Sequence, residues 1–388
     1  MKQGTAARTR HFDLIVIGAG PAGAAAARTA AVSGLQVALV DKRRFPRPKL
    51  CGGGITGRAM GHYRRIFGDA LPDIPLVTCD RFSFFGFGQD LGLTTGVAPL
   101  YLGMRHALDA TLVAQALDAG AADFTGQGGA LDTGDNCLTL NGLRLIAPLI
   151  IAADGVNSPT ARQLFGQAFD RDRIGFALEV EHPETDTTAP VRIDFGAADW
   201  GYGWRFPKAS GTTVGIGGVM ARNADMKSAL AAYQQRLNLP GDLPVKGQFL
   251  PFGAFRSVPG KGRILLAGDA AGLVDPITGE GIGHALLSGE LAARAAITAL
   301  SRAAPDQALA HYCHALKPTH QGLRHACLLR NIMFRERLRP AFIRSFRSSR
   351  TLRTEYFRLM AGETEYGPLM RHMAGRLPGF ALKVLRGI

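Results

Sequence analysis

Three glycines stand close together near the start of the chain, in the run Gly18-Ala19-Gly20-Pro21-Ala22-Gly23. Gly18 permits a tight turn, Gly20 lets the backbone approach a pyrophosphate, and Gly23 allows a helix to pack closely on the preceding strand. Asp41 follows Gly18 by 23 residues and can accept hydrogen bonds from ribose hydroxyls. Because a helix N-terminus also offers free N–H groups and a positive dipole end, the run predicts a dinucleotide site.

Two further acidic residues follow buried apolar runs. Residues 149–153 lead into Asp154-Gly155, and residues 263–267 lead into Gly268-Asp269. Alone, such a strand-end Asp-Gly is more often only a turn. Beyond the second run lies a glycine-flanked helix start, whose backbone N–H groups can face the negative charge of a reduced flavin. It contains Gly279, Gly281 and Ile282.

Two other motifs bring together sulfur, bare backbone and aromatic rings. Cys51-Gly52-Gly53-Gly54 lacks side chains at three consecutive residues, which suits a loop that a flat ring approaches closely. The alternative is a glycine turn beside a buried, inert cysteine. Tyr202-Gly203-Trp204-Arg205-Phe206-Pro207 places three aromatic residues on one strand face, as a pocket lining or as an ordinary core face. Phe84, in the apolar run 81–87, is a weaker candidate for the same lining.

The glycine run, Asp154-Gly155 and Gly268-Asp269 resemble, in this order, the FAD-binding set of the glutathione-reductase-like and p-hydroxybenzoate-hydroxylase-like flavoproteins. The Cys51 loop and the run from Tyr202 to Pro207 are similar to motifs of the geranylgeranyl reductase family, although Asp199 stands where that family has a leading proline. The resemblance implies that Asp269 binds the FAD ribitol or ribose and that Arg105 lies near the cofactor. The implied cofactor-binding residues are Gly18, Gly20, Pro21, Ala22, Gly23, Asp41, Lys42, Cys51, Gly52, Gly53, Arg105, Asp154, Gly268, Asp269, Gly279, Gly281 and Ile282. The implied substrate-binding residues are Gly54, Phe84, Tyr202, Trp204 and Phe206.

The function that this resemblance implies is reduction of carbon–carbon double bonds in an isoprenoid, geranylgeranyl-type substrate, with a hydride from reduced FAD. Tyr202 and Trp204 would face the substrate, because aromatic faces stabilise developing cation character, and Cys51 would take part in proton delivery. An aromatic hydroxylase is an alternative that shares the three FAD motifs. A flavin-dependent halogenase has a similar aromatic motif but needs a lysine near the flavin, and no lysine lies between Leu50 and Lys208. A flavin-binding scaffold or electron carrier is the alternative that is not an enzyme.

These motifs need an α/β fold. Residues 12–17 and 36–40 are expected to form strands that flank a helix over 24–32, which makes a βαβ unit. A second helix is expected over 104–119, a β meander over 174–219, and a helix from Ile282. We therefore predict a Rossmann-type FAD-binding domain with an inserted β-rich substrate domain and a helical C-terminal region. The predicted boundaries are 1–75, 100–170 and 255–315 for the first domain, 76–99 and 171–254 for the second, and 316–388 for the third.

Charge is concentrated at the C-terminal end of the 388-residue chain. Of a net charge of +14, +11 lies from Lys317 onwards, where fifteen lysines and arginines accompany four glutamates. Mixed apolar and arginine residues over 321–360 predict docking on an anionic membrane surface, without nucleic acid as a partner. Five scattered cysteines and no apolar span predict a cytoplasmic protein without a metal site, and the basic C-terminal end allows it a peripheral place on the inner face of the membrane. The electron donor is expected to be transiently bound NAD(P)H or a redox partner protein such as ferredoxin, because only one glycine run has the strand–helix context.

Overall fold

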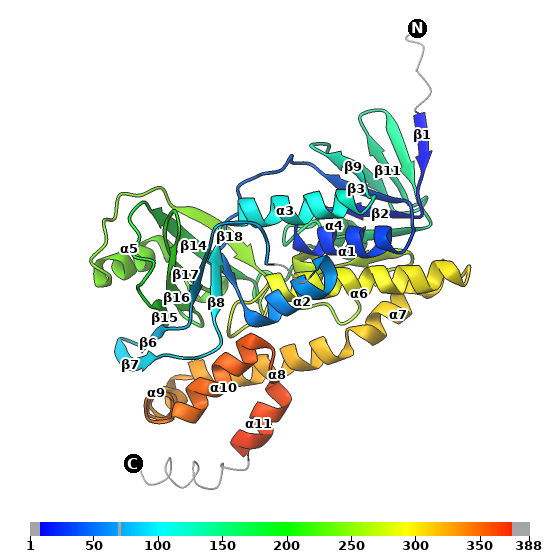
Figure 1. Cartoon of the computed structure of the whole chain (residues 1–388). Helices are drawn as coiled ribbons and strands as arrows, with labels where there is room; N and C mark the ends of the chain where they lie inside the picture. The colour runs from blue at the N-terminus through cyan, green and yellow to red at the C-terminus, as the bar shows by residue number, and fades with distance from the viewer. Residues whose placement is uncertain (1–7, 69–70, 375–388) are drawn as a thin grey trace.

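A parallel sheet lies at the centre of the N-terminal layer of the structure, a computed structural model that describes residues 8–68 and 71–374 (Figure 1). Its six strands follow the order β19-β20-β13-β2-β3-β9, and all except the edge strand β19 pair in parallel. The strands are β2 (Leu14–Ile17), β3 (Val37–Asp41), β9 (Ala122–Thr125), β13 (Leu149–Ala152), β19 (Gly260–Lys261) and β20 (Ile264–Leu266). This confirms the predicted α/β class, with strands drawn from distant segments of the chain.

Five helices cover this sheet: the first, fourth and fifth contact its strands, and the second and third pack on the first or the fifth. They are α1 (Pro21–Val32), α2 (Gly57–Phe67), α3 (Arg105–Asp118), α4 (Pro159–Phe165) and α6 (Ile282–Ser301). Residues 24–27 are fully buried alanines, and Gly289 of α6 lies where a Cβ would collide with the carbonyl oxygen of Ala22. Small side chains therefore let α1 and α6 approach closely. Helix α1 begins at Pro21, earlier than the expected residue 24, because proline suits the first turn of a helix.

A second layer is formed by a seven-stranded sheet in the order β18-β14-β17-β16-β15-β6-β7. Its strands are β6 (Phe82–Gly86), β7 (Gln89–Thr94), β14 (Gly175–His182), β15 (Val191–Phe195), β16 (Tyr202–Lys208), β17 (Gly211–Val219) and β18 (Lys246–Leu250), and α5 (Met226–Arg236) packs on it. The expected meander holds only for β15 to β17. Strand β14 pairs with β17 instead of β15, and β15 pairs in parallel with β6 from much earlier in the chain.

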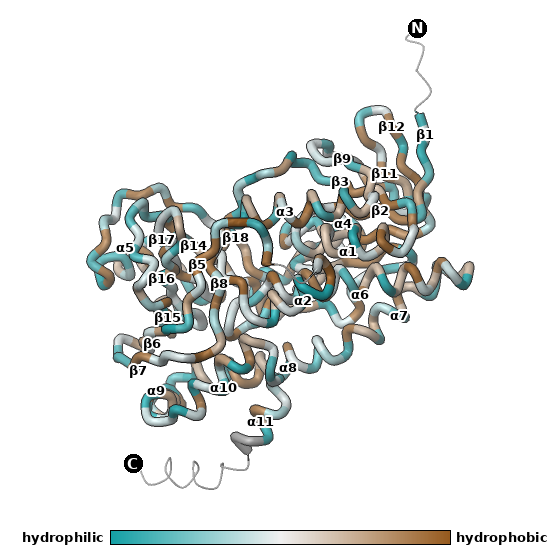
Figure 2. The backbone as a smooth tube through the Cα atoms, in the orientation of Figure 1, coloured by the Kyte–Doolittle hydropathy of each residue, from teal (hydrophilic) through white to brown (hydrophobic). Residues whose placement is uncertain are grey.

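Two small sheets complete the β structure. One contains β1 (Arg8–His11), β12 (Leu143–Ile146), β11 (Cys137–Leu140) and β10 (Ala130–Asp132). Its β1 edge is exposed and hydrophilic (Figure 2). The other contains β4 (Gly54–Ile55), β8 (Leu100–Gly103) and β5 (Leu76–Cys79), and β8 also contacts β16. This second small sheet therefore connects the segment that follows the Cys51 loop with the seven-stranded sheet.

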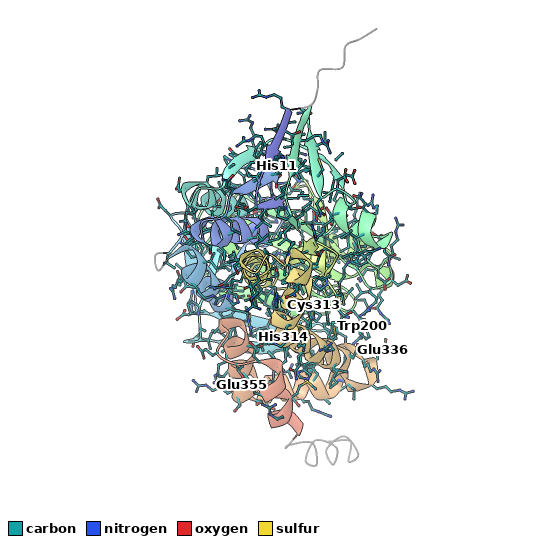
Figure 3. The ribbon with its side chains drawn as sticks, turned by 90° about the vertical axis from the view of Figure 1, so that its right-hand side faces the viewer. His11, Trp200, Cys313, His314, Glu336 and Glu355 are labelled. Atoms are coloured by element: carbon teal, nitrogen blue, oxygen red, sulfur yellow. The ribbon has the colours of Figure 1, made fainter. Side chains whose placement is uncertain are left out.

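The C-terminal region is helical as predicted and packs against the seven-stranded sheet. Its helices are α7 (Ala308–Ala315), α8 (Lys317–Phe334), α9 (Arg339–Ser348), α10 (Arg350–Ala361) and α11 (Tyr366–Ala374). Short 3-10 turns occur at η1 (Met220–Arg222), η2 (Gly268–Ala271), η3 (Pro305–Gln307) and η4 (Glu336–Leu338). Trp200, which precedes β16 and is labelled in Figure 3, stacks on Phe334 with ring centroids 6.3 Å apart. The predicted domain boundaries stay predictions, and residues 375–388 lie outside the described residues.

No helix of the described residues is long and apolar enough to cross a membrane. The mixed segment 321–360 uses most of its apolar side chains internally. Met333, Ile343 and Phe346 are buried in the structure. These three side chains belong to a core cluster with residues of the seven-stranded sheet, so they are not free to contact a membrane. Docking of the C-terminal region on a membrane stays a prediction.

Candidate functional site

The glycine turn between β2 and α1 has the geometry that a phosphate cradle needs. Gly18 has a φ of 94° and lies against Ala153 of the neighbouring strand, and a Cβ on Gly23 would collide with the carbonyl oxygen of Gly18. At Gly20, by contrast, the nearest atom to an added Cβ is a guanidinium nitrogen of Arg47 at 3.8 Å. The fold itself therefore requires glycine at two of the three positions. The third leaves open space in front of the helix N-terminus, which fits a pyrophosphate.

Asp41 closes this turn from the end of β3. Its Oδ2 accepts a hydrogen bond from the Ala19 N–H at 2.8 Å, and its Oδ1 accepts one from the Arg43 N–H at 2.8 Å. A carboxylate has further lone pairs, so ribose hydroxyls can still be bound. Lys42, the next residue, is exposed, so nothing in the structure assigns it a contact.

Three cations gather between the glycine turn and the Gly268-Asp269 turn. Arg105 donates two hydrogen bonds to Asp109, at 2.8 and 2.9 Å, and Arg47 lies 3.5 Å from the same carboxylate. Burial and the charge of Arg105 lower the pKa of Lys49, whereas burial raises the pKa of Asp269 against the opposing effect of Lys49 and Arg105. Three cations facing two carboxylates leave an excess of positive charge. This excess suits the FAD pyrophosphate. Arg105 lies close enough to Asp269 to influence its charge, and contact of Arg105 with the cofactor stays a prediction.

Asp154 follows the end of β13, and one of its carboxylate oxygens binds the start of α4. Its Oδ2 accepts a hydrogen bond from the Thr160 N–H of α4 at 3.1 Å. Its Oδ1 is buried and has no partner among the described residues, and burial raises the pKa of the carboxyl. One oxygen therefore holds the start of a helix, and a role in cofactor binding stays a prediction for the other.

The Cys51 loop lies directly against the aromatic residues of β16. A Cβ added to Gly52 would lie 3.0 Å from the Phe206 ring and 3.1 Å from Trp204 Nε1. A Cβ on Gly54 would lie 3.3 Å from the same Phe206 ring, and Gly53 has a φ of 79°. The two motifs, some 150 residues apart in sequence, therefore form one surface, and the bare backbone is what lets the rings approach.

The three aromatic residues form a continuous row on one face of β16. The ring centroids of Tyr202 and Trp204 are 5.8 Å apart, and those of Trp204 and Phe206 are 6.4 Å apart. Trp204 Nε1 is buried and has no acceptor among the described residues. The row thus presents apolar faces and one unsatisfied donor to the Gly52 side of the loop.

Tyr202 connects this row to the glycine-flanked start of α6. Its hydroxyl donates a hydrogen bond to the carbonyl oxygen of Thr278 at 2.8 Å, and burial raises the pKa of this phenol. Gly279 has a φ of 70°, and a Cβ on it would collide with the Tyr202 hydroxyl. Gly281 and Ile282 follow at the N-terminus of α6, as expected from the sequence.

Cys51 itself lies between the two layers. Its backbone N–H donates to Glu179 Oε1 at 3.0 Å, and its sulfur accepts a weak hydrogen bond from the Gly53 N–H at 3.4 Å. Although burial opposes the charge of Arg105, Asp109 and Cys51 together raise the pKa of its guanidinium. The Cys51 thiol therefore lies beside a permanent cation.

Phe84 does not join this row. It shares the sheet face with Trp204 through Ile193, but its ring is fully buried and lies 5.2 Å from that of Phe346 and 5.6 Å from that of Phe357, in the C-terminal helices. A role for Phe84 in substrate binding stays a prediction. The structure shows it as part of an aromatic core.

Sequence reasoning missed two buried charged residues behind the Cys51 loop. Lys208 continues the two-residue period of Tyr202, Trp204 and Phe206, so its face was predictable once β16 was assigned. Its Nζ lies 3.6 Å from Glu181 Oε1 and 3.4 Å from Met104 Sδ. The other residue is Glu179, an acidic residue inside an apolar strand, where a buried charge needs a partner or a function.

The lack of a lysine between Leu50 and Lys208 does not keep lysines away from the Cys51 loop. A Cβ on Gly53 would lie 3.1 Å from Lys208 Nζ, and Lys49 interacts with Cys51. Separation along the chain does not measure distance in the fold. Lys49 and Lys208 stand at the two ends of the lysine-free interval, and both lie near the Cys51 loop.

Comparisons with known proteins assign these motifs to a family. Residues 13–68 match a family model described as FAD dependent oxidoreductase. The chain is 32% identical to a menaquinone reductase of Mycobacterium tuberculosis over 72% of this chain and 75% of the relative. It is also 32% identical to a digeranylgeranylglycerophospholipid reductase of Methanosphaerula palustris, over 75% of this chain and 78% of the relative. The chain belongs to the geranylgeranyl reductase family of FAD-dependent oxidoreductases.

Solved structures of other proteins share the fold of this chain. A geranylgeranyl bacteriochlorophyll reductase-like protein of Thermoplasma acidophilum matches with a TM-score of 0.76 at 22% identity, over 98% of this chain and all of that one. A variant of a flavin-dependent brominase matches with a TM-score of 0.72 at 18% identity, over 91% and 94%. The fold is thus shared with other flavoproteins, whereas the sequence relatives named here are reductases.

Proposed function

We propose that this family member reduces carbon–carbon double bonds in an isoprenoid substrate. The observation that carries the proposal is the contact between the Cys51-Gly52-Gly53-Gly54 loop and the row Tyr202, Trp204, Phe206. The bare loop backbone separates the cofactor-binding turns from an aromatic face that suits a prenyl chain. Bound FAD, once reduced, would supply the hydride.

An isolated alkene is a poor hydride acceptor, so residues of the chain must stabilise the positive charge that develops on it and supply the proton. Tyr202 and Trp204 present ring faces that stabilise developing positive charge at carbon. Cys51 would deliver a proton to the other alkene carbon, and the neighbouring Arg105 would hold the resulting thiolate. The buried surroundings keep water from competing with the substrate.

Membrane docking is a second part of the proposal, now confined to one side of α8. Leu328 and Ile332 are 53% and 40% exposed, one helical turn apart, and Arg324 and Arg335 are exposed at either end of this pair. Apolar groups flanked by arginine suit an anionic lipid surface, where a prenyl substrate would be found. We further propose a cytoplasmic location at the inner face of the membrane, and electrons from transiently bound NAD(P)H or a ferredoxin-like protein.

The test is turnover of chemically reduced enzyme with prenylated lipids and prenylated quinones in the absence of oxygen. Products heavier by two hydrogens for each bond reduced support the proposal. Product formation only with oxygen would indicate the hydroxylase, and product formation only with oxygen and halide would indicate the halogenase. The experiment with oxygen and halide is included because Lys208 lies at the Cys51 loop.

A further inference from the structure

A buried carboxyl, that of Glu179, contacts the backbone of the Cys51 loop. Glu179 of β14 is only 2% exposed. Its Oε1 accepts the backbone N–H of Cys51 at 3.0 Å, so the side chain points at the loop. Its Oε2 is buried and has no hydrogen-bond partner among the described residues. A buried, half-satisfied carboxyl is costly if it only supports the fold.

The strand register places this carboxyl beside the aromatic row. Glu179 pairs with Gly215 of β17, and Gly215 pairs with Trp204 of β16, so the three residues stand on one face of the sheet. A Cβ on Gly215 would collide with the Trp204 ring. Glycine at this position lets the indole extend across β17 towards Glu179.

Four groups set the charge of Glu179, and they come from every element packed against it. Lys208 of β16 and Lys246 of β18 favour the ionised form, as does the hydrogen bond from the Cys51 loop, whereas Glu181 on the same strand disfavours it. Burial is the largest influence and raises the pKa of Glu179 to about 7. The carboxyl therefore exchanges its proton near neutral pH, as a proton donor in turnover must.

We propose that Glu179 is the proton store of the site and acts through Cys51. In the proposed reduction, on which this inference rests, one alkene carbon gains a hydride and the other gains a proton from the Cys51 S–H. The thiolate then takes the proton of Glu179 as its O–H bond breaks. The carboxylate is reprotonated from water after the product leaves, so atoms and charge balance.

The test is the pH dependence of multiple-turnover reduction by enzyme that a chemical reductant keeps reduced, with a prenyl substrate that the parent converts, because Glu179 must resupply the Cys51 proton between turnovers. The parent rate should fall as pH rises through about 7, because only neutral Glu179 holds the proton. Glu179→Gln keeps a hydrogen-bond acceptor for the Cys51 N–H but holds no exchangeable acid. It should lose this pH dependence and run at least about 100-fold slower below pH 7, with FAD still bound.

Two neighbouring substitutions give opposite shifts in the same profile. Glu181→Gln removes a negative neighbour and should move the fall in rate to lower pH. Lys208→Met removes a positive neighbour and should move it to higher pH. Profiles that stay in place in both variants, or a parent-like profile in Glu179→Gln, would overturn the inference.

An infrared titration supplies a readout that does not depend on turnover. The difference spectrum across about pH 7 should show loss of two protonated carboxyl bands in the parent, because burial also raises the pKa of Glu280 to about 7. Glu179→Gln should lack one of these two bands, which is the Glu179 band. A parent that shows the band but reduces no prenyl substrate would defeat the proposed function and leave the titration standing. A parent that reduces the substrate without the band would defeat only the role of Glu179.

Discussion

A substitution at Gly20 is expected to change cofactor binding without changing folding. Its backbone has an ordinary φ of −71°, and no atom lies within 3.8 Å of where an alanine Cβ would be. Gly20→Ala should therefore leave the apoprotein folded. The usual gain of about 0.4–1 kcal/mol from a less flexible unfolded chain is opposed by the preference for glycine over alanine before a helix. The melting temperature of the apoprotein should change by no more than about 3 °C.

FAD affinity should respond very differently. The added methyl group occupies the space in front of the α1 N-terminus that a pyrophosphate needs, so a charge-assisted hydrogen bond from backbone N–H is lost or lengthened. Such a loss costs about 1.5–3 kcal/mol, which is about a ten- to hundredfold rise in Kd. Calorimetric titration of the apoprotein with FAD measures it.

Gly23→Ala is the matched control on the same turn. Its Cβ would collide with the backbone oxygen of Gly18, which cannot move cheaply, so this variant should lose stability with or without FAD. If Gly20→Ala binds FAD as tightly as the parent, the pyrophosphate does not pass over Gly20 and the proposed cradle is wrong.

Three further predictions concern the buried acid, the thiol and the exposed side of α8. Glu179→Gln should be more stable than the parent by up to about 3 kcal/mol above pH 7, because the parent loses stability as pH rises from 4.5 through the raised pKa of about 7. Urea unfolding at several pH values checks this, and a difference that persists below pH 4.5 would count against it. Cys51→Ser should retain FAD and slow prenyl reduction by about 10²–10⁴-fold, whereas a rate within a few-fold of the parent would remove the thiol from the mechanism. Replacing Leu328 and Ile332 by serine should weaken co-sedimentation with anionic vesicles, while Val32→Ser, at a more exposed position on another helix (67% exposed), should not. Equal binding by both variants would refute docking through α8.

Local patterns in the sequence were sufficient to predict the backbone turns that frame the expected cofactor site, whereas the cofactor contacts themselves stay predictions. The spacing of Gly18, Gly20 and Gly23 reflects contacts within one turn and its neighbouring strand, and these contacts are the ones that the structure shows. The start of α6 at Ile282 was likewise marked by its own glycines. Such features depend on backbone conformation within a few residues, so they can be read directly from the chain.

The rest of the site depends on strand order, which local patterns do not specify. Glu179 reaches Trp204 only because β14 pairs with β17, against the expectation of a simple meander. Phe84 was expected in the substrate lining, but the C-terminal helices cover its ring, and their packing leaves no periodic signal in β6. The two-residue period of β16 places Lys208 on the same face as the aromatic row. Its distance from the Cys51 loop along the chain did not indicate that the two are close in the fold.

The most direct test of the account is whether the electrons held by the enzyme leave to an alkene. Photoreduced enzyme is mixed without oxygen with a prenylated substrate, or with the fully saturated compound that carries the same head group, and flavin absorbance is followed. The account predicts rapid reoxidation by the prenylated compound, with one double bond lost per FAD, and none by the saturated one. Equal reoxidation by both would mean that the head group accepts the electrons, and no reoxidation until oxygen is admitted would mean that the enzyme is not an alkene reductase.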